Sequence, residues 1–123
     1  MFFTHWIIGP QFLGMIFLLA GLIQRWYPPK KINALYGYRT ESSMKDQQSW
    51  DEANRYSTAL MIRYAWIMII AGAIITLALA QLTISEDAYI LSKVGLMIGG
   101  AVVMVVFLIR STEKHLKNFS NKP

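Results

Sequence analysis

Three uncharged apolar blocks, separated by polar sequence, dominate the pattern along the chain. They run from Phe2 to Ile23, Tyr64 to Leu82 and Val94 to Ile109, with lengths of 22, 19 and 16 residues. A helix needs roughly 20 apolar residues to cross the hydrocarbon core of a bilayer, where its own hydrogen bonds satisfy the backbone. The third block reaches that length if it begins at Tyr89 and Lys93 snorkels to the interface. Because no block carries the polar stripe of a soluble bundle helix, the pattern predicts an all-α integral membrane protein with three transmembrane helices.

These segments form one membrane domain over residues 1–123. The predicted bounds are about 4–26, 60–82 and 89–110 for the three membrane helices, 28–58 for a loop and helix between the first two, and 111–123 for a short basic tail that frays at its end. Pro28 and Pro29 end the first helix, because proline lacks a backbone donor and restricts the residue before it.

A helical extension is predicted to lead into the second membrane helix. Ser43-Met44-Lys45-Asp46 has the form of a capping box, in which a serine and an acid satisfy free amide donors at a helix start. No glycine or proline follows until Gly72, so we expect one continuous helix from the polar segment into the bilayer. Trp50, Ala53, Asn54 and Ser57 share one face of this helix by their spacing.

Charge sets the expected orientation. Of the 12 lysines and arginines, only Lys93 lies in the short connection between the second and third blocks, so eleven lie on one side if the chain crosses three times. The positive-inside rule then places the N-terminus outside and both the long loop and the C-terminus in the cytoplasm. The net charge of +5 comes from residues that flank apolar blocks, which favours a lipid bilayer and excludes nucleic acid as a partner.

Catalytic and metal chemistry find little support in the residues. The chain has no cysteine, and His5 and His115 are isolated and expected on opposite sides of the membrane. Ser42 and Lys45 have the S-x-x-K spacing of some acyl enzymes, but a serine near a helix cap explains that spacing. No charged residue lies in the middle of a span, which argues against a proton relay or an ion-coupled transporter. We therefore predict no catalytic residue, no cofactor and no metal.

The segment from Asn33 to Thr40 has a composition unusual for a linker. Tyr36 and Tyr38 flank Gly37, and Arg39 follows. The planar guanidinium of arginine suits a carboxylate or a phosphate, and tyrosines supply stacking with a hydroxyl group. One interpretation is a pocket for an anionic headgroup or a peptide carboxylate. The other is that Arg39 pairs with Asp46, Asp51 or Glu52, or rests on lipid phosphates.

Helix packing is suggested by Gly95 and Gly99, a small-xxx-small pair in the third apolar block. Such a pair lets two helices approach closely. We expect it to pack within the bundle, with dimerisation as the alternative.

This part of the chain resembles a known family. The matching motifs are Lys31-Ile32-Asn33, Tyr36-Gly37-Tyr38-Arg39-Thr40, Ser43-Met44-Lys45 and Trp50-x-x-Ala53-Asn54. Together they resemble the signature of the SdpI/YfhL family, bacterial membrane proteins named for immunity to a sporulation-delaying peptide toxin. The resemblance covers roughly residues 10–110 and implies a shared binding feature made of Asn33, Tyr36, Gly37, Arg39, Thr40, Ser43, Lys45, Trp50 and Asn54. The named immunity proteins carry a further membrane-spanning half before this module, and this chain is expected to lack it.

The resemblance implies a multi-pass protein of the bacterial inner membrane that protects against a membrane-active peptide or envelope stress by binding. Arg39 would contact an anion and Trp50 would serve as an apolar anchor. Candidate partners are a peptide toxin, a cytoplasmic regulator sequestered at the membrane, an anionic lipid headgroup and a second copy of the chain. A lipid-modifying enzyme that uses Ser43, Asp46 or Asp51 is the catalytic alternative.

Overall fold

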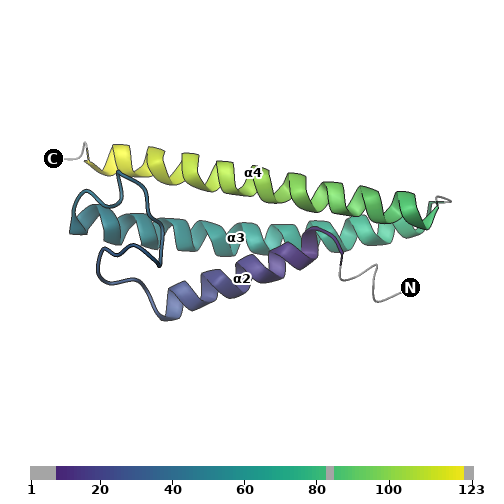
Figure 1. The fold of residues 1–123 in the computed structure, drawn as a ribbon, viewed down its shortest axis with the longest axis horizontal. Coiled ribbons are helices and arrows are strands. Elements are labelled where there is room, and N and C mark those ends of the chain that lie inside the picture. The colour runs from purple at the N-terminus through teal and green to yellow at the C-terminus, as the bar shows by residue number, and fades with distance from the viewer. Residues whose placement is uncertain (1–7, 83–84, 121–123) are drawn as a thin grey trace.

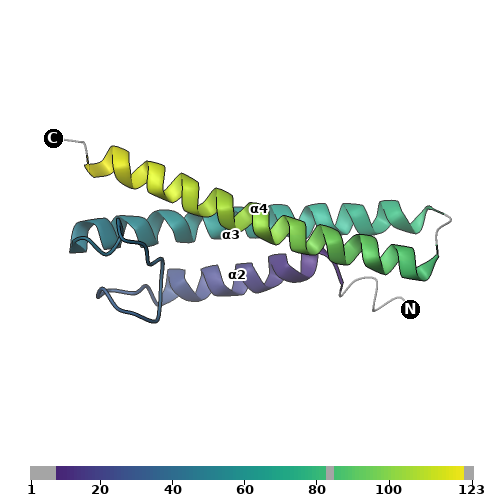
Figure 2. The same ribbon diagram turned by 45° about the horizontal axis from the view of Figure 1, so that its top comes forward.

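The computed structural model describes residues 8–82 and 85–120, which form three helices and a long loop between the first two. The helices are α2 (Pro10–Trp26), α3 (Gln47–Ala80) and α4 (Glu86–Ser120). α2 and α4 both run antiparallel to α3, and α2 lies along the middle of α3, from Thr58 to Thr76 (Figure 1). The long α2–α3 connection and the end of α4 lie at one end of the bundle, and α4 crosses α3 at a shallow angle (Figure 2). The prediction of an all-helical chain is confirmed for the described residues.

The outer surface of the bundle is apolar, as expected for helices in lipid. α3 and α4 are each long and apolar enough to cross a membrane. Ile70, Ile74, Leu77 and Val103 are more than half exposed, the reverse of their usual burial in a soluble protein. The 17 residues of α2 extend about 25 Å at 1.5 Å per residue, close to the lower limit for a membrane span. A third crossing and the orientation of the chain stay predictions.

The ends of α2 agree only in part with the predicted span of 4–26. The helix ends at Trp26, before Pro28, as predicted. It begins at Pro10, because proline fixes a helical φ and its missing donor is no loss in the first turn. Residues 1–7, and with them His5, lie outside the described residues.

α3 is continuous from Gln47 to Ala80, which confirms the predicted extension into the apolar block. The predicted capping box is wrong, because the N-cap is Asp46 and not Ser43. The Asp46 carboxylate accepts a hydrogen bond from the Ser49 backbone N–H at 2.8 Å, and that bond lowers the pKa of Asp46. A carboxylate at a helix N-terminus also interacts favourably with the helix dipole.

α4 extends ten residues beyond the predicted end of its span at residue 110. The basic tail is therefore the last part of a helix up to Ser120, and residues 121–123 lie outside the described residues. Thr112 and Leu116 of this extension are buried, so its inner face packs on the rest of the protein. This packing, which single-sequence patterns do not show, explains why the helix does not end at the membrane boundary.

Close helix contact uses Gly14 and Gly72, not the pair predicted from sequence. A Cβ atom added to Gly14 of α2 would lie 2.9 Å from the Ala65 carbonyl oxygen of α3. One added to Gly72 of α3 would fall on the backbone nitrogen of Gln11. A Cβ on Gly95 or Gly99 would meet nothing within 4 Å. The prediction that these glycines pack within the bundle is therefore wrong, and dimerisation through them stays a prediction.

Candidate functional site

The entry to the α2–α3 loop is fixed by two side chains from the first turns of α3. Trp50 is 0% exposed, and its indole N–H donates to the Pro29 carbonyl oxygen at 2.6 Å. The Gln47 amide donates to the next carbonyl, that of Lys30, also at 2.6 Å. Trp50 therefore fixes the loop from the protein interior, and as a fully buried side chain it offers no surface to a partner in the predicted role of apolar anchor.

Asn54 connects the same helix to the middle of the loop. Its Oδ1 accepts from the Tyr38 backbone N–H at 2.6 Å, and its Nδ2 donates to the Trp50 carbonyl at 2.9 Å. Gly37 has φ +104°, and a Cβ there would lie 2.6 Å from Asn54 Oδ1. Only glycine meets both requirements without strain. The predicted face is confirmed, because Trp50, Ala53, Asn54 and Ser57 are all buried.

Two smaller turns complete the loop. Asn33 Oδ1 accepts from the backbone N–H groups of Leu35 and Tyr36 at 2.9 and 2.7 Å. The Tyr36 hydroxyl donates to the Tyr27 carbonyl at 2.6 Å. These bonds give Asn33 and Tyr36 a structural task, since an asparagine side chain can replace a backbone acceptor in a turn.

Ser43 closes the second turn rather than presenting a nucleophile. It is fully buried, and its hydroxyl accepts from the Thr40 backbone N–H at 2.8 Å. The same hydroxyl lies 3.0 Å from the Thr40 carbonyl and 3.2 Å from the Tyr38 carbonyl, to which it donates. The serine of the signature therefore holds the two ends of a turn together.

Glu113 of α4 is a site residue that sequence reasoning missed. The hydroxyl groups of Tyr38 and Thr40 both donate to Glu113 Oε2, at 2.8 and 2.9 Å. These two bonds join the loop to α4, across more than 70 residues of sequence. The sequence did contain one indication of its role. Glu113 is a single acidic residue among Arg110, Lys114 and Lys117, and a tail that only needs positive charge has no use for an acid there.

The ionisation of Tyr38 provides a test of this contact. Burial raises the pKa of Tyr38 well above its usual value near 10, and the bond to Glu113 raises it further. Above about pH 10 the unfolded chain loses this proton first, so the tyrosine's contribution to stability is complete below that pH and falls above it. We expect Tyr38 to ionise last in an absorbance titration, and at lower pH in Glu113→Gln. A Tyr38 that titrates identically in both proteins would contradict the contact.

Of the nine residues assigned to the shared binding feature, Arg39 and Lys45 are those with exposed side chains. The Arg39 guanidinium donates to the Ala34 carbonyl of its own loop, and no bond to Asp46, Asp51 or Glu52 is present. Arg39 also lines a cavity of about 290 Å³ that the loop forms together with α2, α3 and α4. The structure therefore does not contain the pairing of Arg39 with a carboxylate that the sequence left open.

Glu52 and His115 form a second contact between α3 and the end of α4. His115 Nε2 lies 3.1 Å from Glu52 Oε1, and its ring stacks on Tyr56 with centroids 4.0 Å apart. The guanidinium of Arg55 also binds Glu52, and this bond is the main cause of the lowered pKa of Glu52. His115 is thus a packing residue and not isolated, and the described residues contain no group able to hold a metal ion.

Lys93 belongs to a polar cluster inside the bundle that the apolar blocks concealed. It is 0% exposed and donates to the Thr76 hydroxyl, which also accepts from Gln11 Nε2 at 3.1 Å. The ammonium group lies 5.6 Å from the centroid of the Tyr89 ring. The expectation that Lys93 snorkels to the interface is wrong, because its side chain is buried in the bundle and donates to Thr76 of α3.

Comparison with known proteins gives two matches over this region. The model of the SdpI/YfhL protein family matches residues 30–111, which contain the loop from Lys30 onward, α3 and most of α4. The protein named "Uncharacterized protein YfhL" of Bacillus subtilis (strain 168) is 39% identical over 104 residues, which is 85% of this chain and 82% of that protein. No solved structure matches the chain.

Proposed function

Because the chain belongs to the SdpI/YfhL protein family, we propose that it protects a bacterial cell against a membrane-active peptide toxin or envelope stress. It acts in the inner membrane by binding a partner through its cytoplasmic loop, without catalysis. Arg39 contacts a carboxylate or phosphate of that partner. The single observation that supports this function most is an exposed arginine on a loop fixed by buried side chains.

A fixed loop favours binding because little conformational freedom is lost when a partner arrives. Trp50, Asn54 and Ser43 hold the loop from the protein side, so Arg39 is presented in one arrangement. Its guanidinium offers further donors beyond the bond to Ala34, in a planar fork that suits an anion. The cavity of about 290 Å³ beside it adds room for an apolar group of the partner.

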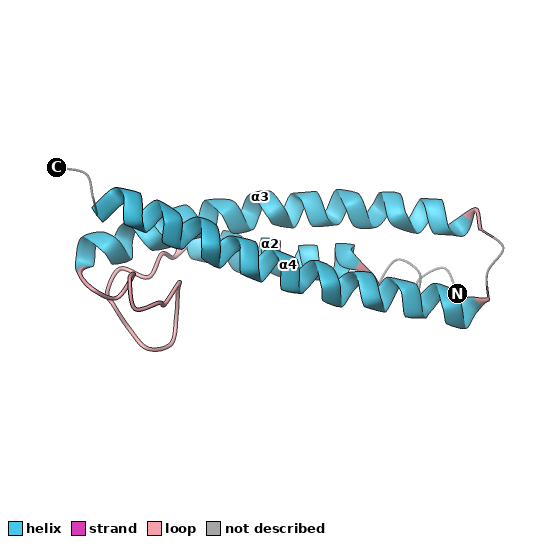
Figure 3. Cartoon of the chain, turned by 90° about the horizontal axis from the view of Figure 1, so that it is seen from above, coloured by secondary structure: helices cyan, strands magenta, loops and turns pink. Residues whose placement is uncertain are grey.

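The position of the loop supports a cytoplasmic site. The loop and the end of α4 lie together at one end of the bundle (Figure 3). These two segments carry most of the basic residues of the chain. Basic residues near membrane helices are retained in the cytoplasm, which supports a cytoplasmic location for this end of the bundle.

Arg39→Ala is expected to abolish most of the protection that the wild type gives a sensitive host challenged with sporulation-delaying peptide. A charge-assisted hydrogen bond is worth about 1.5–3 kcal/mol, so its loss weakens binding by roughly tenfold or more. Survival is measured at matched membrane levels, with Lys117→Ala as a control for the loss of one exposed positive charge. Full protection by Arg39→Ala would refute the role of Arg39, and no protection by the wild type would refute toxin immunity.

Sequestration of a cytoplasmic regulator is a second candidate function, favoured by Leu35. This side chain is 92% exposed in a polar loop, where an apolar surface suits a protein partner. Sequestration predicts no resistance in a naive host that lacks the regulator, whereas direct protection predicts resistance there. A lipid-modifying reaction gains nothing from Ser43, whose hydroxyl is buried and bonded within the loop.

A further inference from the structure

We propose that the cavity between the end of α2 and the first half of α3 binds one anionic phospholipid, with the phosphate at its mouth and the apolar part against its floor. Its volume is about 580 Å³, within the range of about 300–1,000 Å³ for ligand pockets. The cavity differs from the smaller one beside Arg39, although Gln24 lines both. The proposal requires a membrane location but does not rest on toxin protection.

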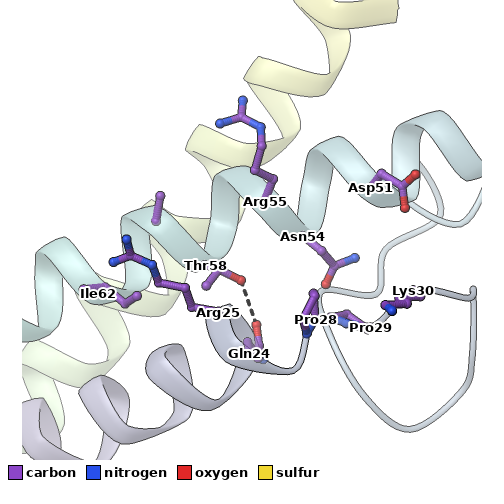
Figure 4. Close-up of a pocket in the computed structure, with 11 residues that line it drawn as sticks. Gln24, Arg25, Pro28, Pro29, Lys30, Asp51, Asn54, Arg55, Thr58 and Ile62 are labelled. Atoms are coloured by element: carbon purple, nitrogen blue, oxygen red, sulfur yellow. Dashed lines mark hydrogen bonds between the residues drawn. The ribbon is translucent and has the colours of Figure 1, made fainter.

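The lining combines cations with apolar groups. Arg25, Lys30 and Arg55 are exposed at the cavity, and Asp51 is the acid among the lining residues. The Asp51 carboxylate already accepts from the Gln47 amide at 2.8 Å. In Figure 4, Arg25 extends from α2 towards α3, Lys30 lies on the opposite side, and Arg55 points away from α2. Arg25 and Lys30 therefore flank the cavity from two sides and give it a positive charge for an anionic headgroup.

Apolar side chains also line the cavity. They belong to Pro28 and Pro29 from the loop and to Ala59 and Ile62 from α3. A free phosphate gains nothing from such a surface, whereas the glycerol and upper acyl carbons of a phospholipid bury apolar area against it. The chemistry of the lining thus fits an anionic amphiphile better than a soluble anion.

The walls of the cavity are formed before any ligand binds. The carbonyls of Pro29 and Lys30 are held by Trp50 and Gln47, each at 2.6 Å. On the membrane side, the Thr58 hydroxyl lies 3.0 Å from Gln24 Oε1 and joins α3 to α2 (Figure 4). A site held in this way needs little reorganisation on binding, which favours a specific lipid over a diffuse attraction to the membrane surface.

The depth of the cavity matches lipid headgroups. Trp26 and Tyr27, the residues that end α2 next to Arg25, are 67% and 72% exposed. Exposed tryptophan and tyrosine at the end of an apolar helix are typical of the interface between hydrocarbon and water. A phosphate at Arg25 would therefore lie at headgroup level, with its acyl chains directed along the apolar surface of α3.

The test measures lipid retention by the purified full chain in detergent, using native mass spectrometry and thermal shift. The probes are phosphatidylglycerol, phosphatidylcholine with the same acyl chains, and glycerol 1-phosphate as the headgroup alone. We expect the wild type to retain phosphatidylglycerol in preference to phosphatidylcholine, with no effect of glycerol 1-phosphate. Arg25→Gln with Lys30→Gln should weaken phosphatidylglycerol binding by about fivefold per cation removed.

Two further variants separate this site from general charge and from folding. Lys114→Gln with Lys117→Gln removes two exposed cations from α4 at the same end of the bundle and should leave retention unchanged. Ala59→Phe keeps every charge but fills the cavity, and it should abolish retention while the thermal unfolding midpoint without lipid stays close to the wild type. Equal losses in the two double variants, retention by Ala59→Phe, or competition by glycerol 1-phosphate would each overturn the proposal.

Discussion

A Trp50→Ala variant is expected to lose about 3–5 kcal/mol in its free energy of unfolding, the loss typical of a fully buried large aromatic residue. Trp50 is 0% exposed and carries the bond that ties Pro29 to α3. Its removal leaves a cavity beneath the loop and an unsatisfied carbonyl. The loop would then move freely, and binding through Arg39 should be lost with it. Chemical unfolding in detergent micelles, followed by helical circular dichroism, measures the change.

Two companion variants separate the causes of that loss. Trp66→Ala removes the same side chain from a 52% exposed position on the same helix and should cost much less. Trp50→Phe keeps most of the apolar bulk but removes the donor to Pro29, for an expected loss of about 1–3 kcal/mol. If Trp50→Ala were no less stable than Trp66→Ala, the loop would not depend on this tryptophan.

Replacing Gly72 with leucine is expected to separate α2 from α3. Any Cβ at this position falls on the backbone of Gln11, which cannot move aside as a flexible side chain can. Overpacking of this kind typically lowers the free energy of unfolding by about 1–3 kcal/mol. We expect a loss near the upper end of that range, because the leucine meets backbone rather than a side chain. Hydrogen exchange should increase along α2, and the bond between Gln11 and Thr76 should be lost.

Gly99→Leu is the matched control for this change. Nothing lies within 4 Å of a Cβ added there, so the stability of the monomer should equal that of the wild type. A loss of self-association in Gly99→Leu, with unchanged monomer stability, would instead support the dimerisation predicted from sequence. A fully stable Gly72→Leu would show that α2 does not pack against α3 as described.

Local sequence patterns located the α2–α3 loop as a distinct unit, but they did not reveal what each of its residues does. The signature from Asn33 to Asn54 was predicted as a functional unit, and the helical spacing correctly placed Trp50 and Asn54 on one face. Spacing cannot say whether that face meets a partner or the protein itself. The structure shows that it meets the loop, so the tryptophan is a support and Arg39 is the exposed group.

The cap of α3 was misassigned for a similar reason. Ser43 and Asp46 are both good capping residues, and the pattern alone could not choose between them. In the structure the Ser43 hydroxyl accepts a hydrogen bond from the Thr40 backbone N–H, so it is used within the loop. The Asp46 carboxylate accepts from the Ser49 backbone N–H and caps α3 instead.

By itself the sequence determined the helical class, the long apolar segments, the end of the first helix at its prolines and the continuity of α3. These properties follow from composition and from spacing along one segment, where a residue's neighbours in sequence are its neighbours in space. Only the tertiary structure decided the contact of Glu113 with the loop, the burial of Lys93 between three helices and the use of Gly14 and Gly72 as close contacts. Each of these joins residues far apart in the chain, and such pairings depend on how whole helices pack rather than on any local pattern.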